Sequence, residues 1–230
     1  MDTSERKTRV KAVLFDLGGT LVYTTEIPKV YKKILEAQGI KRSLLEISRA
    51  HEETEKHLDI QKLAVLFEEY WIRWNLHMLK RLGIKENMRA LAETIADRWW
   101  DYADVGLYPD VEETLQQLRE KHLKTGIVTN GLESDYTTIL QKVGLHDFFD
   151  VIVGIDTVGK MKPHRDIFLH ALNRLEVLPS ETLFVGDQLE DDYEGARKVG
   201  LKPLLIDRDN TISSGVEKIG NLKEIVNYLV

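Results

Sequence analysis

The stretch VKAVLFDLGGT, residues 10–20, determines the fold prediction. Residues 10–15 are almost entirely apolar, and this run stops at Asp16 and then meets Gly18 and Gly19. A short apolar run that ends at glycines is typical of a buried strand rather than a helix. The sequence therefore predicts a strand at residues 10–15, with Asp16 directly after its carboxyl end.

The chain beyond residue 108 alternates between short apolar runs and amphipathic stretches. The predicted strands are residues 126–128, 149–155, 182–185 and 202–206. The predicted helices begin near Pro109-Asp110 and then cover residues 134–143, 166–175, 193–199 and 222–229. Alternation of this kind indicates a parallel sheet with right-handed crossovers and helices on both faces. The predicted fold class is α/β, with a Rossmann-like parallel sheet as its core.

The section between the first strand and this alternating part reads as helix throughout, without one convincing strand. Its predicted helices lie near residues 28–39, from Ser43 onward, at residues 63–82 and at residues 86–100. Ser43 is followed three residues later by Glu46, which is the pattern of a capping box. This section reads as an inserted helical domain at residues 23–103, within a core formed by residues 1–22 and 104–230.

The composition excludes several classes of protein. The chain has 230 residues, with 32 Lys+Arg against 38 Asp+Glu, and its formal net charge of −6 argues against a general nucleic-acid binder. It has no cysteine, which removes disulfides, thiolate nucleophiles and Cys-ligated metals. No apolar run approaches the roughly 18 residues of a membrane span, and no signal peptide is evident. We therefore expect a cytoplasmic protein with no nucleic-acid or membrane partner.

Polar residues follow the predicted strands at the edge where an open parallel sheet binds its ligands. Asp16, Thr129 and Asp187 each stand at the end of a strand, and Lys162 lies in a loop between strand and helix. Crowded carboxylates raise each other's pKa unless a cation compensates, and hard oxygen ligands suit Mg²⁺. A cation, a lysine and N–H donors around one carboxylate describe a phosphoryl-transfer site with an aspartate nucleophile.

Four stretches in order resemble the motifs of the haloacid dehalogenase (HAD) superfamily. They are VLFDLGGTL at residues 13–21, VTNG at 128–131, GKMKP at 159–163 followed by Ile167-Phe168, and FVGDQLEDDYEGA at 184–196. The inserted section has the size of the helical C1-type cap of that superfamily. The resemblance covers most of the chain, and it implies a Rossmann-like core that carries an α-helical cap.

The resemblance also implies a role for each matching residue. Asp16 corresponds to the nucleophile, and Asp16 and Lys162 are the expected catalytic residues. The expected metal ligands, for Mg²⁺, are Asp16, the main-chain carbonyl of Gly18, Asp187 and Asp192. The expected phosphate-binding residues are Thr129 and Lys162, with Lys160 as the alternative lysine. Asn130 is expected to bind phosphate as well, through its backbone N–H at the start of a loop. Asp191 is expected to cap a helix or face solvent.

One position departs from the pattern of the family's phosphatases. These enzymes usually carry an Asp two residues after the nucleophile as general acid and base, whereas this chain has Gly18, which cannot transfer a proton. General acid–base help is typically worth about 10²–10⁴-fold in rate. The 2-haloacid dehalogenases also lack that Asp, but they work without a metal and would not need the acidic segment at residues 186–192.

The expected function is therefore Mg²⁺-dependent hydrolysis of a small phosphate monoester, such as a sugar phosphate or phosphoglycolate, through an aspartyl phosphate. One alternative is a 2-haloacid dehalogenase. Another is a catalytically weak module with the same fold that binds a phosphoryl ligand or a protein, and Gly18 favours this alternative. A mutase is disfavoured. The expected partner is a small phosphorylated metabolite, and hinges are expected near residues 22–25 and 102–107. The sequence predicts neither the physiological substrate nor the oligomeric state.

Overall fold

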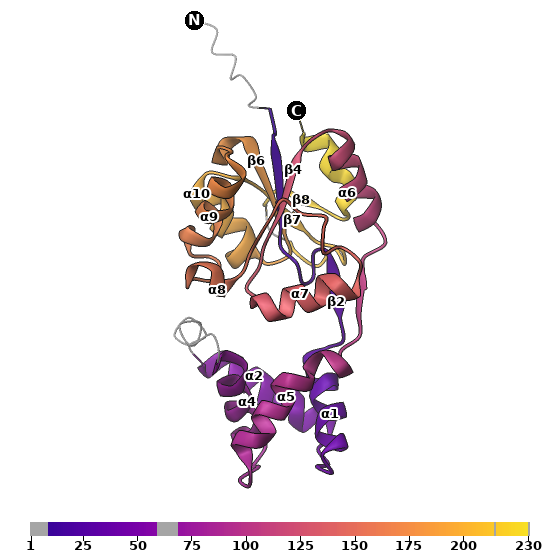
Figure 1. The fold of residues 1–230 in the computed structure, drawn as a ribbon, viewed down its shortest axis with the longest axis vertical. Coiled ribbons are helices and arrows are strands. Elements are labelled where there is room, and N and C mark those ends of the chain that lie inside the picture. The colour runs from indigo at the N-terminus through magenta and orange to yellow at the C-terminus, as the bar shows by residue number, and fades with distance from the viewer. Residues whose placement is uncertain (1–8, 59–68, 214, 230) are drawn as a thin grey trace, which may run out of the picture. The chain divides into compact units, whose positions relative to one another are not determined.

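The computed structural model of the protein describes residues 9–58, 69–213 and 215–229. The chain divides into two compact units (Figure 1). The core unit comprises Met1–Tyr23 and Gly106–Val230, and the helical unit comprises Thr24–Val105. The helical unit is thus inserted between two segments of the core unit.

A six-stranded sheet forms the middle of the core unit, in the order β5-β4-β1-β6-β7-β8, and each neighbouring pair is parallel. Its strands are β1 (Ala12–Phe15), β4 (Lys124–Val128), β5 (Val151–Val153), β6 (Thr182–Gly186), β7 (Lys202–Ile206) and β8 (Lys218–Ile219). All four residues of β1 are fully buried, because this strand lies inside a sheet that is covered on both faces. The predicted α/β core with a parallel sheet is confirmed.

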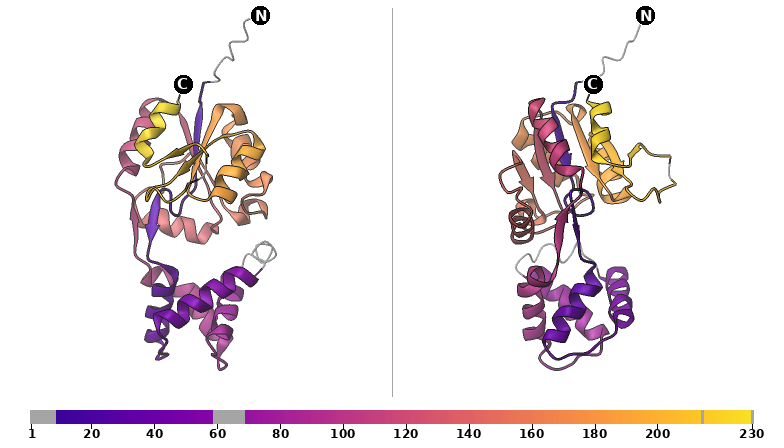
Figure 2. Two further views of the ribbon diagram at one scale, coloured as in Figure 1. Left: turned by 180° about the vertical axis from the view of Figure 1, so that it is seen from behind. Right: turned by 90° about the vertical axis from the view of Figure 1, so that its right-hand side faces the viewer.

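Helices cover the two faces of the sheet (Figures 1 and 2). The helices α9 (Arg165–Leu175) and α10 (Gly195–Val199) lie on one face, and α6 (Val111–Glu120) and the 3₁₀ helix η4 (Leu222–Tyr228) lie on the other. Two shorter connections are α8 (Ile155–Val158) and the 3₁₀ turn η2 (Pro179–Glu181), and α7 (Glu133–Lys142) follows β4. On the α9 face, Phe168 packs its ring against the ring of Phe184 from β6, with 5.1 Å between the centroids.

The register of the sheet explains why distant residues meet. In β1, Phe15 is paired with Ile127 of β4 on one side and with Val185 of β6 on the other. All three strands run in the same direction, so they end at one edge of the sheet. Asp16 and the residues that follow β4 and β6 therefore emerge next to one another at this carboxyl edge.

The helical unit has its own hydrophobic core. Its helices are α1 (Ile27–Ala37), α2 (Leu44–His57), α4 (Tyr70–Arg81) and α5 (Met88–Tyr102). Ile34, Ile47 and Ile95 are fully buried at its centre. The capping box at Ser43 is confirmed, since Glu46 N donates to Ser43 Oγ at 3.2 Å and Ser43 N donates to Glu46 Oε2 at 2.8 Å. Residues 63–68 of the predicted third helix lie outside the described residues.

Two predicted elements differ from the structure in their bounds or their type. The strand predicted for residues 149–155 begins only at Val151 and ends at Val153. It ends there because Gly154 N donates to Thr157 Oγ1 at 3.1 Å and α8 begins at Ile155. The helix predicted for residues 222–229 is a 3₁₀ helix, η4. In addition, a π-helical turn, η3 (Leu189–Glu194), precedes α10. It includes the first two residues of the helix predicted for residues 193–199 and the predicted loop before it.

Three short strands are missing from the sequence-based prediction. Two of them, β2 (Val22–Thr24) and β3 (Val105–Leu107), pair as a two-stranded sheet where the chain passes between the units. The third is β8, which has only two residues. Segments of two or three residues, with side chains that are largely exposed or half-buried, carry no alternating pattern.

None of the helices in the described residues combines the length and the apolar character that crossing a bilayer requires.

Candidate active site

Asp16 is held at the end of the central strand. Its backbone N–H donates to the carbonyl of Val185 at 2.8 Å, which continues the pairing of β1 with β6 by one residue. The residue as a whole is only 7% exposed. A carboxylate at this depth needs a partner of opposite charge, because burial disfavours its ionised form.

Lys162 is that partner, although it lies 146 residues away in the sequence. Its Nζ donates to Asp16 Oδ1 at 2.5 Å and to Asp192 Oδ1 at 2.6 Å. The lysine is 3% exposed, so the ammonium is almost fully withdrawn from water. Lys160, the alternative of the sequence analysis, is exposed.

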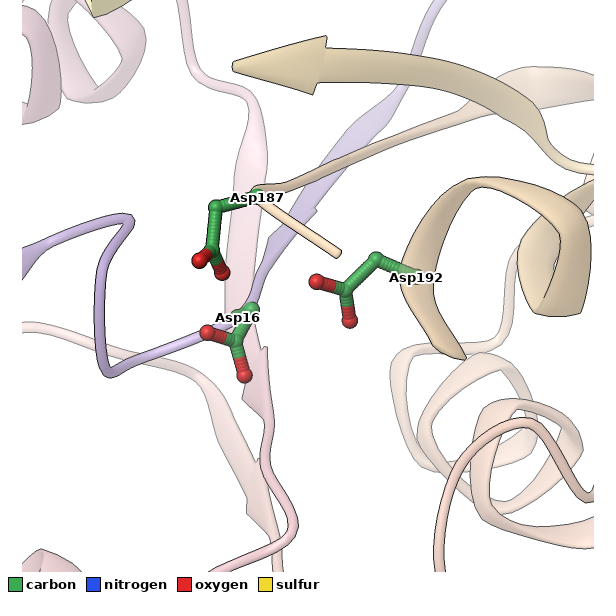
Figure 3. A group of neighbouring side chains, drawn as sticks. All are labelled: Asp16, Asp187 and Asp192. Atoms are coloured by element: carbon green, nitrogen blue, oxygen red, sulfur yellow. The ribbon is translucent and has the colours of Figure 1, made fainter. Parts of the chain in front are cut away.

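Three carboxylates converge beside this lysine (Figure 3). One oxygen from each of Asp16, Asp187 and Asp192 can be chosen so that all three lie within 4.8 Å of one another. The residues come from three places, namely the ends of β1 and β6 and the π-helical turn η3. Gln188 holds two of them in place, because its N–H donates to Asp192 Oδ2 at 3.0 Å and its Nε2 donates to Asp187 Oδ2 at 2.7 Å.

The electrostatics of this group show an excess of negative charge. Burial and the neighbouring carboxylates Asp192 and Asp187 raise the pKa of Asp16 to about 7, against the opposing effect of Lys162. Burial and Asp192 also raise the pKa of Asp187. Burial alone would lower the pKa of Lys162, but Asp16 and Asp192 overcome it and raise this pKa. Three ionised carboxylates and one ammonium sum to −2, which a divalent cation would neutralise.

A second observation fits a cation at this place. Asp187 Oδ1 is buried and has no hydrogen-bond partner among the described residues. A buried polar atom without a partner is uncommon in proteins and points to a missing ligand, ion or water. Carboxylate oxygens are also the ligands that Mg²⁺ prefers. The donor set of the site therefore fits Mg²⁺.

The loop after β4 lies beside the lysine. Thr129 is 6% exposed; its N–H donates to the carbonyl of Val153 at 2.9 Å, and its Oγ1 accepts from Gly131 N at 3.2 Å. The side chain of Asn130 forms two hydrogen bonds with the backbone of Lys162. Its Oδ1 accepts from Lys162 N at 2.7 Å, and its Nδ2 donates to Lys162 O at 3.4 Å. The side-chain amide of Asn130 thus positions the lysine, while the expected binding of phosphate by its main-chain N–H stays a prediction.

Asp191 also differs from its expected role. Burial raises its pKa, and its Oδ2 accepts from Asn130 Nδ2 at 3.3 Å. It is therefore tied to the lysine loop rather than being only a cap or a solvated residue. The contacts of Asn130 with Lys162 and with Asp191 join loops that are 32 and 61 residues apart in the sequence, and no local sequence pattern predicts them.

The turn after Asp16 brings backbone close to the carboxylates. Gly19 N donates to the carbonyl of Val22 at 2.8 Å, and Gly19 has a φ of +79°. A Cβ at Gly19 would lie 2.5 Å from Asp187 Oδ2, so only glycine fits. A Cβ at Gly18, in contrast, meets no described atom within 4 Å. Gly18 lies in this same turn, and the role of its carbonyl as a metal ligand remains a prediction.

Comparison with known proteins agrees with this arrangement. The family of haloacid dehalogenase-like hydrolases matches residues 10–200, which hold the carboxylates, the lysine and the helical unit. The chain belongs to the haloacid dehalogenase-like hydrolases. It is 32% identical over 203 residues to the glyceraldehyde 3-phosphate phosphatase of Methanopyrus kandleri, covering 86% of this chain and 84% of the relative.

Solved structures share the fold. The HAD phosphatase from Thermococcus onnurineus is 31% identical, with a TM-score of 0.67, and the match covers 96% of this chain and 98% of that one. A 2-haloacid dehalogenase from Pseudomonas syringae has a TM-score of 0.69 at 22% identity, covering 96% of this chain and 98% of that one. At that identity the likeness shows the fold alone. Because phosphatases and dehalogenases share this fold, the reaction has to be argued from the site.

Proposed function

We propose that this chain is a Mg²⁺-dependent phosphatase that hydrolyses a small phosphate monoester through an aspartyl phosphate on Asp16. The observation that carries the proposal is the group of Asp16, Asp187 and Asp192, whose oxygens lie within 4.8 Å of one another beside Lys162. A dehalogenase that expels halide without a metal has no use for a site with this excess of negative charge. The phosphatase names of the relatives in Methanopyrus kandleri and Thermococcus onnurineus support the same choice.

The proposed reaction has two steps. The carboxylate of Asp16 attacks phosphorus in line, the bond from phosphorus to the leaving oxygen breaks, and an aspartyl phosphate forms. Water then attacks the phosphorus, releases phosphate and restores Asp16. The ammonium of Lys162 offsets negative charge on the transferring group, where most of the catalysis by such sites resides.

The remaining residues bind and orient. The hydroxyl of Thr129 and the main-chain N–H of Asn130 are proposed to hold phosphate oxygens, while the Asn130 amide keeps Lys162 in place. Asp16, Asp187, Asp192 and the carbonyl of Gly18 are the proposed Mg²⁺ ligands, Asp192 either directly or through water. The bound cation would neutralise charge on the phosphoryl group and stabilise the developing negative charge.

The helical unit is proposed to act as a C1-type cap that excludes water from the reaction. Its hydrophobic core, centred on Ile34, Ile47 and Ile95, supports its behaviour as a separate body. The substrate class proposed is a small phosphorylated metabolite such as a triose phosphate or phosphoglycolate. The glyceraldehyde 3-phosphate phosphatase activity named for the Methanopyrus kandleri relative makes that sugar phosphate the first one to assay.

The test is phosphate release from p-nitrophenyl phosphate, followed by glyceraldehyde 3-phosphate, phosphoglycolate, hexose phosphates and nucleotides. We expect turnover with Mg²⁺, little with chelator, and a loss on the order of 10³-fold or more in Asp16→Asn. The matched control is Asp191→Asn, which removes a neighbouring carboxylate outside the three-carboxylate group and should retain turnover. Robust release by Asp16→Asn or by metal-stripped protein contradicts the mechanism.

Two further measurements separate the alternatives. Halide release from 2-chloropropionate in the presence of chelator, with no phosphate release, would identify a dehalogenase. Mg²⁺-dependent binding of phosphorylated ligands without turnover would identify a binding module, the alternative favoured by Gly18.

A further inference from the structure

Arg208 lies just beyond the carboxyl end of β7 and joins two segments that are far from it in the sequence. Its Nη2 donates to the carbonyl of Thr20 at 2.8 Å, in the turn that follows Asp16. Its Nη1 donates to Asp110 Oδ2 at 2.9 Å, at the start of α6. One guanidinium therefore ties the turn after the proposed nucleophile to the body of the core unit.

A third contact fixes the plane of this guanidinium. The Arg208 carbon Cζ lies 3.8 Å from the centroid of the Tyr108 ring. The backbone N–H of Tyr108 in turn donates to the carbonyl of Leu21 at 3.2 Å. Arginine suits this position because its planar fork can stack on a ring and donate from two nitrogens at the same time, which lysine cannot do.

The pair of Arg208 and Asp110 is not an ordinary surface ion pair. Their side chains are 17% and 8% exposed, and Leu222 N donates to the same oxygen, Asp110 Oδ2, at 2.7 Å. Within the described residues the buried Nε of Arg208 has no partner, so its two Nη groups carry the hydrogen bonds of this anchor. Removing one partner of a buried pair leaves the other charge uncompensated. Loss of Arg208 should therefore destabilise the contacts around Asp110.

The anchored turn, residues 17–22, is part of the site. It is closed internally by Leu21 N donating to Leu17 O at 2.9 Å and by Gly19 N donating to Val22 O at 2.8 Å. Its backbone passes Asp187 so closely that a Cβ on Gly19 would lie 2.5 Å from Asp187 Oδ2. A small displacement of this turn therefore changes the surroundings of Asp187, and with them the space between the three carboxylates.

We propose that Arg208 is a positioning residue of the active site, which holds the turn at residues 17–22 against Asp187 and thereby sets the affinity for the divalent cation and the rate of turnover. It acts through Thr20 and through the ring of Tyr108, and it touches neither phosphate nor cation. The part of the proposal that concerns rate rests on the proposed phosphatase function. The part that concerns the order of the turn does not.

The first test is hydrogen exchange of the backbone amides of Gly19, Leu21 and Val22 in the full-length protein, which needs no activity. In Arg208→Gln we expect these amides to exchange at least about tenfold faster, because the turn opens locally when its anchor is lost. Arg208→Lys keeps the charge but not the fork and should fall between the wild type and Arg208→Gln. Mg²⁺ binding measured by calorimetry should weaken at least about tenfold in Arg208→Gln.

The second test is kinetic. With p-nitrophenyl phosphate, we expect kcat at saturating Mg²⁺ to fall about tenfold or more in Arg208→Gln, while KM for the ester changes less than about threefold. This split is expected because the variant disturbs the surroundings of the cation and leaves Thr129 and Lys162 untouched. Asp110→Asn should also lower kcat more than it changes KM, but by a smaller factor. Added to Arg208→Gln, it should lower kcat little further, because both residues act through one network.

Two control variants separate positioning from general damage. Leu175→Ala removes a buried side chain at the end of α9, near the opposite edge of the sheet, where Leu175 O accepts from Lys124 Nζ. It should lower the melting temperature and leave the exchange of residues 19–22 and the Mg²⁺ affinity unchanged. Lys11→Gln removes a cation paired with Glu181 before the start of β1 and should also leave both unchanged.

The outcomes are distinct. Exchange and Mg²⁺ affinity like those of the wild type in Arg208→Gln would overturn the proposal, and so would Leu175→Ala reproducing the changes. If Arg208→Gln does not fold, Arg208→Lys and Asp110→Asn decide by the same measurements. A wild-type protein without phosphatase activity would defeat the proposed function, while exchange and calorimetry would still decide the role of Arg208.

Discussion

Replacing Asp187 with asparagine is expected to affect stability in opposite directions with and without Mg²⁺. In the metal-free protein at pH 8, the group of Asp16, Asp187 and Asp192 carries three negative charges against the one positive charge of Lys162. Removing the negative charge of Asp187 relieves its repulsion with Asp16 and Asp192 and should stabilise the metal-free protein. In the metal-bound protein, the same substitution removes a ligand whose Oδ1 is buried and has no protein partner in the described part of the chain.

The magnitude follows from the spacing of the carboxylates. At 4.8 Å and an effective dielectric constant near 20, one repulsion between unit charges is about 3.5 kcal/mol. Asp187 has two such neighbours, but Lys162 and relaxation of the site offset much of this, so we expect about 1–2 kcal/mol to remain. At about 2–4 °C per kcal/mol, chelated Asp187→Asn should melt roughly 2–8 °C above the chelated wild type.

Mg²⁺ should reverse the order. At 100 times its dissociation constant, a ligand that binds only the native state stabilises it by about 2.7 kcal/mol. If the substitution weakens binding a hundredfold, the same Mg²⁺ concentration stabilises Asp187→Asn by only about 0.4 kcal/mol. Above the crossing concentration, the wild type is then the more stable protein.

Thermal unfolding at pH 8, followed by circular dichroism across a Mg²⁺ titration, measures both effects. Asp191→Asn is the matched control. It also removes one carboxylate, here a half-buried one in the turn η3, but it leaves the three-carboxylate group intact. It should keep the full Mg²⁺ shift of the wild type. A lower melting temperature of Asp187→Asn than of the wild type in chelator, or an equal Mg²⁺ shift in both proteins, would show that Asp187 neither repels its neighbours nor binds the cation.

Two other predictions concern the turn after β1 and the titration of the site. Gly18→Asp should raise turnover of alkyl phosphates by about tenfold or more and change that of p-nitrophenyl phosphate little, because a side chain has open space there and only an alkoxide needs a proton. Gly19→Asp, which would meet Asp187, should abolish turnover of both esters, and an equal response of both esters to Gly18→Asp would count against the idea. Because burial and its carboxylate neighbours raise the pKa of Asp16 to about 7, the protonated form contributes stability that is fully present below about pH 4 and is lost as the pH rises through 7. The melting temperature of the chelated protein should therefore fall between pH 5 and pH 8, and a flat profile would contradict this.

The sequence was sufficient for the parallel core because its strands are buried and apolar. Residues 10–15 show this directly, since β1 is fully buried in the structure. The placement of Asp16 and Asp187 at one edge also followed from the sequence, because the carboxyl ends of parallel strands share an edge. The strands β2, β3 and β8 could not be found in this way, because two or three residues do not show a period.

The contacts that organise the site were beyond sequence reasoning for a different physical reason. The sequence indicates the backbone N–H of Asn130 as a phosphate donor, and it gives no sign that the side-chain amide binds the backbone of Lys162. Arg208 stands alone in a loop after β7 and carries no motif, although its side chain reaches Thr20 across 188 residues of sequence. Hydrogen bonds of this kind depend on where loops meet after the sheet has formed, and local patterns do not record that.

The proposed mechanism requires Asp16, Asp187 and Asp192 to share one divalent cation. Crystals grown with Mn²⁺ in place of Mg²⁺, with diffraction recorded at the manganese absorption edge, locate that cation without any assumption about activity. We expect one anomalous peak among these carboxylates, about 2.0–2.2 Å from an oxygen of Asp16 and an oxygen of Asp187. Manganese bound only at exposed carboxylates, with no peak between Asp16 and Asp187, would contradict it.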